Sequence, residues 1–301
     1  MVGSYAGAAH AAPSTTELTK QIEKASDQLE DVTESYNKMN LQLKKTQDDQ
    51  KKLEASLAPA QAALAAASSQ VDTIAVTSYK QGRIGPVTAL LGSGENDLMD
   101  RMAFLDQITR ANQRDIDNYT ETTQTFGQRK AALKATQAKQ AAQVKEIAAR
   151  KTKIEKDIKK LMAMRTAAYG QGQETGSKYT GKIPSIAGSA GKAVTFAYNQ
   201  IGKPYSYGAD GPGSYDCSGL TSKAWAAAGK SLPHNAAAQW DEVSHISRSA
   251  LQPGDLVFYR SLGHVGIYVG DGMIIDAPHT GTVVKKRSVD ASTPYGYGRV
   301  T

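Results

Sequence analysis

The 301-residue chain contains a single cysteine, Cys217. One thiol cannot form an intramolecular disulfide, so no disulfide framework holds this fold together. Aromatic residues are also few, at 7% of the chain. No run of about 18 apolar residues occurs, so we expect no membrane-spanning helix.

Two further features are missing from the sequence. The five histidines and the carboxylates do not cluster at the spacing of zinc ligands, so we expect neither a metal nor another cofactor. The net charge of +7 is not accompanied by a nucleic-acid-binding motif, so we expect no nucleic-acid partner. The charge fits a solvated, lysine-rich helical surface or a weak attraction to an anionic cell wall.

Residues 1–13 form a segment of their own. The small residues around His10 resemble the A-x-A pattern of a signal cleavage site, but a basic n-region and an apolar core are lacking. Two interpretations stay open, a signal remnant or a disordered terminus. The first predicts a secreted protein.

Residues 14–165 show helical periodicity. Apolar residues recur in alternating steps of four and three from Leu18, and with weaker positions the register reaches Ile74. This heptad pattern predicts a long helix in a coiled coil, with a kink at Pro59. Glycines within residues 82–94 interrupt it and suggest a small subdomain, after which helical spacing resumes from Leu98. We expect an antiparallel hairpin, with an intermolecular dimer as the alternative.

Residues 166–190 are rich in Gly, Ser and Thr, which predicts a flexible linker. Residues 191–301 then form a domain of different composition. Its helical stretch at 190–203 and its helix after Cys217 are followed by four strand-like runs, at 255–260, 264–270, 273–277 and 282–287. Helices followed by strands in this order indicate an α+β domain.

Cys217 directly precedes a run of good helix formers that ends near Gly229. A thiol in the first turn of a helix is favoured as a thiolate by the helix dipole. A catalytic thiol also needs a general base, and His264 at the start of a strand is the best placed histidine. A buried structural cysteine and a structural histidine remain the alternatives at this point.

Three motifs in order carry a family resemblance: "GKPYSYGADGPGSYDCSGLTSKAW", "LQPGDLVFY" and "GHVGIYVGDGMIIDAPHTG". Together they resemble the NlpC/P60 family of cell-wall cysteine peptidases over about residues 190–301. The resemblance implies a papain-like α+β catalytic domain after an all-α antiparallel coiled-coil hairpin. It also implies that Cys217 is the nucleophile and that His264 is the base.

In that family a polar third residue lies on the strand after the catalytic histidine, which here matches Asp276. A three-residue loop at 270–272 would place His264 opposite Pro278, with Asp276 on the same face. A two-residue turn would instead place His264 opposite His279. We favour Asp276, because a carboxylate stabilises the cationic imidazole, and keep His279 as the fallback.

Further roles follow from the same resemblance. Tyr205 matches a tyrosine whose hydroxyl would serve the oxyanion or the substrate. Asp216 and Ser218 match positions that recognise the free amino end of the stem peptide, although both residue types also cap helices well. His234 and Asn235 depart from the family's usual basic residue and small hydroxyl, which leaves groove specificity open.

The resemblance therefore implies a secreted, cell-wall-associated peptidoglycan endopeptidase that acts in wall remodelling or division. The expected target is the D-γ-glutamyl–diaminopimelate bond. The helical half is similar to the arms of secreted peptidoglycan hydrolases, which implies autoinhibition or docking on a membrane division complex of the FtsEX type. Two alternatives are a coiled-coil adaptor with a non-hydrolytic wall-binding domain, and an amidase or acyltransferase on a related Cys–His fold.

Overall fold

A computed structural model describes residues 15–81 and 95–301 of the chain. The expected signal remnant at 1–13 and the glycine-bearing segment at 82–94 therefore lie outside the described residues. The chain divides into two compact units, which are treated separately below. The first contains residues 1–42 and 144–301, and the second contains residues 43–143.

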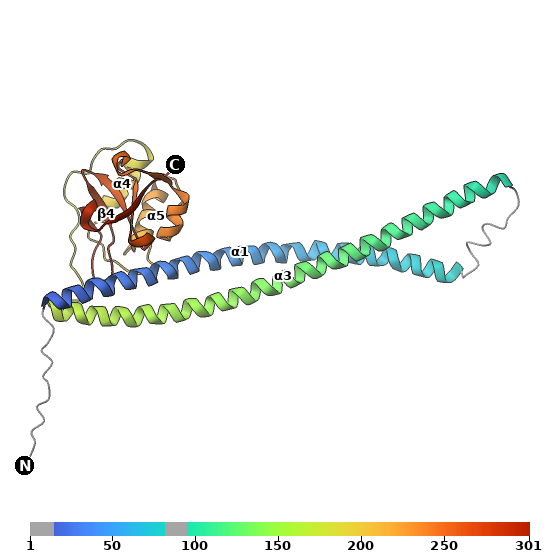
Figure 1. The fold of residues 1–301 in the computed structure, drawn as a ribbon, viewed down its shortest axis with the longest axis horizontal. Helices are drawn as coiled ribbons and strands as arrows, with labels where there is room; N and C mark the ends of the chain where they lie inside the picture. The colour runs from blue at the N-terminus through green and yellow to red at the C-terminus, as the bar shows by residue number, and fades with distance from the viewer. Residues whose placement is uncertain (1–14, 82–94) are drawn as a thin grey trace, which may run out of the picture. The chain divides into compact units, whose positions relative to one another are not determined.

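Two long helices form an arm, α1 (Thr15–Gln81) and α3 (Glu95–Tyr169). They run antiparallel (Figure 1), as the side-chain pairs in the first unit show. Tyr169 Oη lies 3.2 Å from Thr19 Oγ1, while Arg150 bonds to Ser35 further along α1. The apolar cluster between the helices consists of Ile22, Leu29, Ile154 and Leu161.

Within the second unit the same two helices continue side by side. Arg129 donates to the Ser56 carbonyl at 3.0 Å, and Ala60 and Ala67 are buried. α1 continues as a helix through Pro59. The chain thus supplies both helices of its own coiled-coil seam, in the antiparallel hairpin that we expected from the sequence.

The C-terminal domain contains three α-helices and a six-stranded antiparallel sheet. The helices are α4 (Gly188–Gln200), α5 (Cys217–Ala227) and α6 (Ala236–Glu242). The strands are β1 (Ser244–Ile246), β2 (Leu256–Tyr259), β3 (His264–Gly270), β4 (Met273–Asp276), β5 (Lys285–Ser288) and β6 (Pro294–Arg299). Their order in the sheet is β1-β6-β2-β3-β4-β5.

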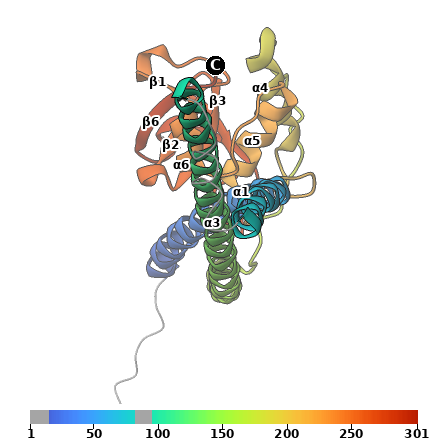
Figure 2. The same cartoon turned by 90° about the vertical axis from the view of Figure 1, so that its right-hand side faces the viewer.

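The domain core lies between the sheet and the helices α4 and α5, which sit together on one side of it (Figure 2). Its members include Val194, Leu220, Leu256, Ile267 and Ile275. Residues 170–187, all described, contain no helix or strand. Part of this segment nevertheless packs on the core through Tyr179, Ile183 and Ile186.

The fold is thus an α+β domain preceded by an antiparallel helical hairpin, as the sequence predicts. The sequence did not indicate α6, β1 or β6. β1 has only three residues and β6 reads "PYGYGR", whose glycines and proline are unfavourable in a strand. None of the helices in the described ranges has both the length and the apolar character needed to cross a lipid bilayer.

Candidate active site

Cys217 is the first residue of α5 and is fully buried. The residue before it, Asp216, is the N-cap, and its carboxylate accepts from the Gly219 backbone N–H at 2.7 Å. This cap fixes the first turn of the helix and, with it, the direction of the thiol. At the other end the helix stops at Ala227, and Gly229 takes a left-handed φ of 83°.

The β3–β4 hairpin positions His264 and Asp276. Gly270 pairs with Met273, so the turn has two residues, but a register shift follows between Tyr268 and Gly270. Beyond this shift Ile267 pairs with Ile275, the register expected for a three-residue loop. The irregularity restores the face relation that brings the Asp276 carboxylate to the His264 ring.

His264 Nε2 lies 2.7 Å from Asp276 Oδ2, and both residues are buried. Arg287 from β5 donates through Nε to the same carboxylate at 2.8 Å and 3.1 Å. Burial would raise the pKa of Asp276, but Arg287 and His264 outweigh it and lower this pKa to about 2. The carboxylate therefore stays ionised and holds the Nε2–H of the ring.

Gly266 makes room for this pair. A Cβ at position 266 would lie 3.2 Å from Asp276 Cβ and 3.4 Å from the Ile275 carbonyl oxygen. The end of the Ile274 side chain would lie 3.1 Å away, so a larger residue would require the side chains of Ile274 and Asp276 to shift.

The arm contributes a third group to the site. Glu30 of α1 is 1% exposed, and one of its carboxylate oxygens bonds to His264 Nδ1. Its other oxygen bonds to Arg260, which also pairs with Asp27. One ligating atom from each of Glu30, Cys217 and His264 lies within 4.8 Å of the other two.

These contacts determine the charge on the Glu30–His264 pair. Burial opposes both charges, but His264 and Arg260 still lower the pKa of Glu30. Glu30 and Asp276 likewise overcome burial and raise the pKa of His264. The imidazole is therefore a cation that donates from both nitrogens, one to each carboxylate.

A second arm carboxylate, Glu34, lies one helical turn further on. It accepts from Ser218 Oγ at 2.7 Å, from Asn235 Nδ2 at 2.7 Å and from the Ala236 backbone N–H at 2.7 Å. Cys217 Sγ is 3.4 Å from the same carboxylate. Burial and the neighbouring Asp216 raise the pKa of Glu34 to about 7.

The thiol responds to the same surroundings. Burial, followed by the carboxylates of Glu34 and Glu30, raises the pKa of Cys217 well above its ordinary value. The thiol is thus protonated while His264 already carries two protons. In this arrangement the site contains neither a thiolate nor a free base.

The structure brings most of the sequence-predicted site residues together. Tyr205 is buried, and burial followed by the charge of Glu30 raises its pKa far above normal. Asp216 accepts from Asn37 of α1 at 3.0 Å and lies 2.7 Å from His234 Nε2. The ring nitrogens of His264 bond to Glu30 and Asp276 rather than to His279, whose Nδ1 lies 2.9 Å from the Thr280 carbonyl oxygen.

Sequence reasoning missed the arm residues Glu30, Glu34 and Asn37, as well as Arg260 and Arg287. The arm residues recur in steps of four and three, as an apolar seam does, but with polar side chains. Such a stripe is ordinarily a solvated helix face. Nothing in the local sequence distinguishes a solvated polar stripe from the buried polar stripe found in α1.

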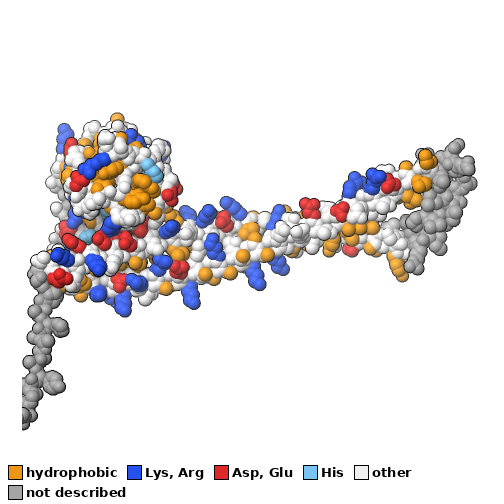
Figure 3. Space-filling view, viewed as in Figure 1, with side chains coloured by type: hydrophobic (Ala, Val, Ile, Leu, Met, Phe, Trp, Pro, Cys, Tyr) orange, Lys and Arg blue, Asp and Glu red, His pale blue; other side chains and the backbone are white. Residues whose placement is uncertain are grey.

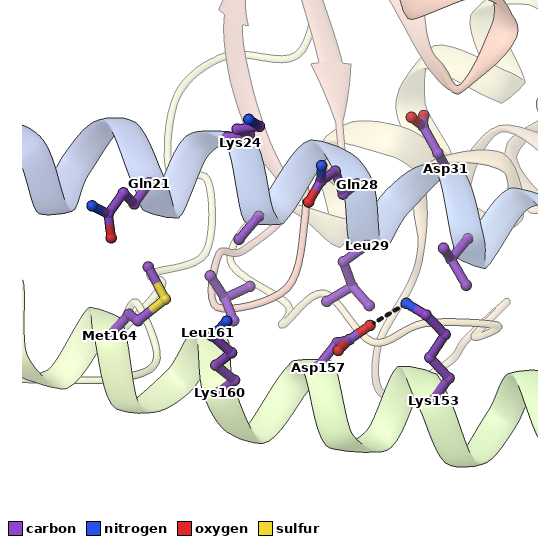
Figure 4. A pocket seen from close by; sticks show the side chains of 12 residues that line it. Gln21, Lys24, Gln28, Leu29, Asp31, Lys153, Asp157, Lys160, Leu161 and Met164 are labelled. Atoms are coloured by element: carbon purple, nitrogen blue, oxygen red, sulfur yellow. Dashed lines mark hydrogen bonds and ion pairs between the residues drawn. The ribbon is translucent and has the colours of Figure 1, made fainter.

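Two cavities flank this region within the first unit. One of about 660 Å³ lies between α1 and α3 (Figure 4), where Lys153 pairs with Asp157 at 2.6 Å. It is lined by no nucleophile or histidine. The other, of about 570 Å³, is lined by His264, Arg260 and Arg287. Acidic side chains gather where the domain meets the arm (Figure 3), and Glu23 and Asp27 line this second cavity.

Known proteins share sequence similarity with the C-terminal domain that carries this site. Residues 202–297 match the family model described as the NlpC/P60 family. A protein of Corynebacterium glutamicum named "Probable endopeptidase" is 44% identical over 106 residues, 35% of this chain and 51% of that protein. "Probable endopeptidase p60" of Listeria grayi is 43% identical over 109 residues, 35% of this chain and 21% of that protein.

The chain thus spans about half the length, or less, of the curated relatives it matches. Among solved structures, the NlpC/p60 domain of the peptidoglycan hydrolase SagA is 34% identical, with a TM-score of 0.35. That match covers 37% of this chain and 98% of the SagA domain. By the family model, residues 202–297 of this chain form an NlpC/P60 domain.

Proposed function

We propose that the protein is a peptidoglycan endopeptidase with Cys217 as nucleophile, His264 as general base and acid, and Asp276 as the residue that orients His264. The observation that carries this proposal is the convergence of the three at the first turn of α5. A thiol beside an imidazole that is held by a carboxylate is the arrangement that thiol acyl transfer requires.

In the uncovered site, the Cys217 thiol passes its proton to His264 Nδ1, and the thiolate attacks the amide carbonyl carbon. The imidazolium formed is stabilised by Asp276, which Arg287 keeps ionised. His264 then gives the proton to the leaving amine, and a thioester remains on Cys217. Water, deprotonated by His264, hydrolyses the thioester and restores the thiol.

Tyr205 is assigned to the oxyanion of the tetrahedral intermediate. It is buried beside the nucleophile, and burial keeps its hydroxyl protonated and able to donate. Asp216 is assigned to the free amino end of the stem peptide, as the family resemblance implies.

The contacts of Glu34 support the D-γ-glutamyl bond as the target. Ser218 Oγ, Asn235 Nδ2 and the Ala236 N–H converge on a carboxylate next to the thiol. A D-γ-glutamyl linkage leaves the α-carboxylate of that residue free, and such a cradle would hold it. Ser218 then binds the carboxylate of the substrate rather than its amino end.

Autoinhibition by the arm is part of the proposal. Glu30 takes the Nδ1 position that must receive the thiol proton, and Glu34 occupies the carboxylate cradle. The arm thus acts as a substrate mimic that must leave before a stem peptide can enter.

The second unit is proposed to receive the opening signal. Large apolar side chains are exposed there, including Tyr79 at 88%, Met99 at 78% and Phe104 at 63%. Exposed apolar side chains of this size are typical of binding surfaces. A membrane division complex of the FtsEX type is the proposed partner, which would place the secreted protein at the cell wall.

The test is digestion of purified sacculi, followed by mass spectrometry of the fragments. The variant Glu30→Ala/Glu34→Ala should release peptides cleaved after the D-γ-glutamyl residue. Adding Cys217→Ala to that variant should abolish the release. Equal fragments with and without the thiol would contradict the peptidase proposal, whereas equal rates for wild type and the arm variant would contradict autoinhibition alone.

A further inference from the structure

We propose that the closed site binds a zinc ion through Cys217 Sγ, His264 Nδ1 and Glu30, and that the ion latches the arm onto the catalytic domain. The three donors come from α5, β3 and α1, which are far apart in the sequence. Zinc binding as a latch rests on the autoinhibition proposed above, whereas the metal site itself rests on the geometry alone.

The donor atoms have suitable types and spacing. Thiolate sulfur, imidazole nitrogen and carboxylate oxygen are the protein ligands that Zn²⁺ takes, about 2.0 to 2.3 Å from the ion. Atoms at these distances in a tetrahedron lie roughly 3.3 to 3.8 Å apart. The three donors here lie within 4.8 Å of one another. His264 Nδ1 and the Glu30 oxygen, now in direct hydrogen-bond contact, would move apart by about 1 Å to admit an ion between them.

The outer contacts are those of a metal site. The second nitrogen of His264 lies 2.7 Å from Asp276 Oδ2, so it is already engaged and Nδ1 is the nitrogen offered. Glu30 uses its second oxygen to bind Arg260, which fixes the first one toward the site. A ligating histidine backed by a carboxylate is the usual outer shell of protein zinc.

All three donors are at least 97% buried, so an ion there would be shielded from solvent. On binding, the ion replaces the thiol proton and the Nδ1 proton, and both protons leave to solvent. Because one ligand belongs to the arm and two belong to the catalytic domain, the full set exists only in the closed state. Zinc therefore favours closure by its differential affinity for the two states.

The experiment uses the full chain after chelator treatment, with Co²⁺ and then Zn²⁺ as probes. Tetrahedral Co²⁺ bound by a thiolate gives a sulfur-to-metal charge-transfer band in the near ultraviolet. We expect this band in the wild type and its loss on addition of Zn²⁺. Glu30→Gln should weaken the affinity for Co²⁺ at least about tenfold, the low end of losses seen even for outer-shell changes.

Glu54→Gln is the matched control, because Glu54 is an exposed carboxylate of the same helix that accepts from Gln50. It should bind Co²⁺ as the wild type does. Hydrogen exchange provides the latch readout, since Ala236 N–H donates to Glu34 only when the arm is closed. Zn²⁺ should slow exchange at the start of α6 in the wild type and in Glu54→Gln, but not in Glu30→Gln.

Three results would overturn the inference: no charge-transfer band in the wild type, equal affinity in Glu30→Gln, or exchange at α6 that Zn²⁺ leaves unchanged. Sacculus digestion in chelator separates this outcome from the proposed function. Cys217-dependent cleavage without a cobalt band removes only the zinc site. A band without such cleavage leaves the metal site standing and removes the peptidase.

Discussion

One continuous helix, α1, contains two stretches of similar polarity and opposite burial. In the first unit the polar residues Glu30, Thr33, Glu34 and Asn37 are between 0% and 5% exposed. In the second unit the polar residues Asp48, Asp49 and Glu54 are exposed. Sequence composition does not distinguish the two stretches, so the difference comes from what covers them.

The comparison teaches what the buried stretch is for. A buried carboxylate is costly unless it is paired and hydrogen-bonded, and a buried ion pair adds little net stability. Glu30 and Glu34 satisfy their oxygens with His264, Arg260 and Asn235, all from the catalytic domain. Glu30 and Glu34 are therefore complementary to the polar groups of the active site. An apolar helix face would have held the arm without the free-energy cost of burying two carboxylates.

The largest effect is expected from Glu30→Ala. The change removes the buried carboxylate that His264 and Arg260 share in the closed state and leaves them only Asp276 and Asp27, which costs about 3 kcal/mol. This shifts the closed–open equilibrium by about a hundredfold. The measurement is the rate at which iodoacetamide alkylates Cys217, because the thiol is fully buried when the arm is closed.

Glu54→Ala serves as the control for that prediction, since it removes a carboxylate from the exposed stretch of the same helix. Its alkylation rate should equal that of the wild type. If both variants react at the wild-type rate, the two stretches do not differ in function and the arm does not protect the thiol.

An intermediate effect is expected from pH, through Glu34. The closed state raises the pKa of this carboxyl to about 7, first through burial and then through Asp216. Closure therefore takes up a proton at Glu34, so it is most favoured at low pH, weakens as the pH rises from the ordinary carboxyl pKa of 4.5 towards 7, and changes no further above 7. The groups that face Glu34 are Cys217, Asp216, Ser218, Asn235 and the Ala236 N–H.

The variant Glu34→Gln isolates this effect, because glutamine keeps an accepting oxygen and cannot ionise. In chelator-treated protein, the ratio of the wild-type to the Glu34→Gln alkylation rate of Cys217 cancels the titration of the thiol itself. We expect this ratio to rise by up to about tenfold per pH unit between pH 5 and 7 and to level off between pH 7 and 8. A ratio that stays flat across this range would contradict the link between Glu34 and closure.

Much of the fold could be predicted from the sequence, because it depends on local periodicity. The heptads of α1 and the strand patterns around Val257 and Ile267 carry their own signals. The proposed catalytic set was also within reach, since the placement of Asp276 beside His264 follows from the register of one hairpin. The register of Asp276 relative to His264 depends on a strand irregularity near Tyr268. Counting loop residues in the sequence left two registers open.

The contacts of the α1 carboxylates with the site could not be predicted in the same way. Glu30 is 187 positions from Cys217 and 234 from His264, and no local pattern encodes a contact across that separation. The same separation is why ligand spacing in the sequence could not indicate the zinc site proposed above. Ligand spacing reveals a site only where the donors share one segment, whereas here three elements supply one donor each.

The smallest effect is expected from Asn37→Ala, at the end of the buried stretch. Asn37 Nδ2 donates to Asp216 Oδ2 at 3.0 Å, but Asp216 keeps its contacts with His234 and the Gly219 N–H. Losing one hydrogen bond while the acceptor stays satisfied costs about 1 kcal/mol, so alkylation of Cys217 should accelerate about fivefold. Asn118→Ala, on the exposed face of α3, should change nothing. An effect of Asn37→Ala as large as that of Glu30→Ala would show that neutral contacts, rather than the paired carboxylates, hold the arm in place.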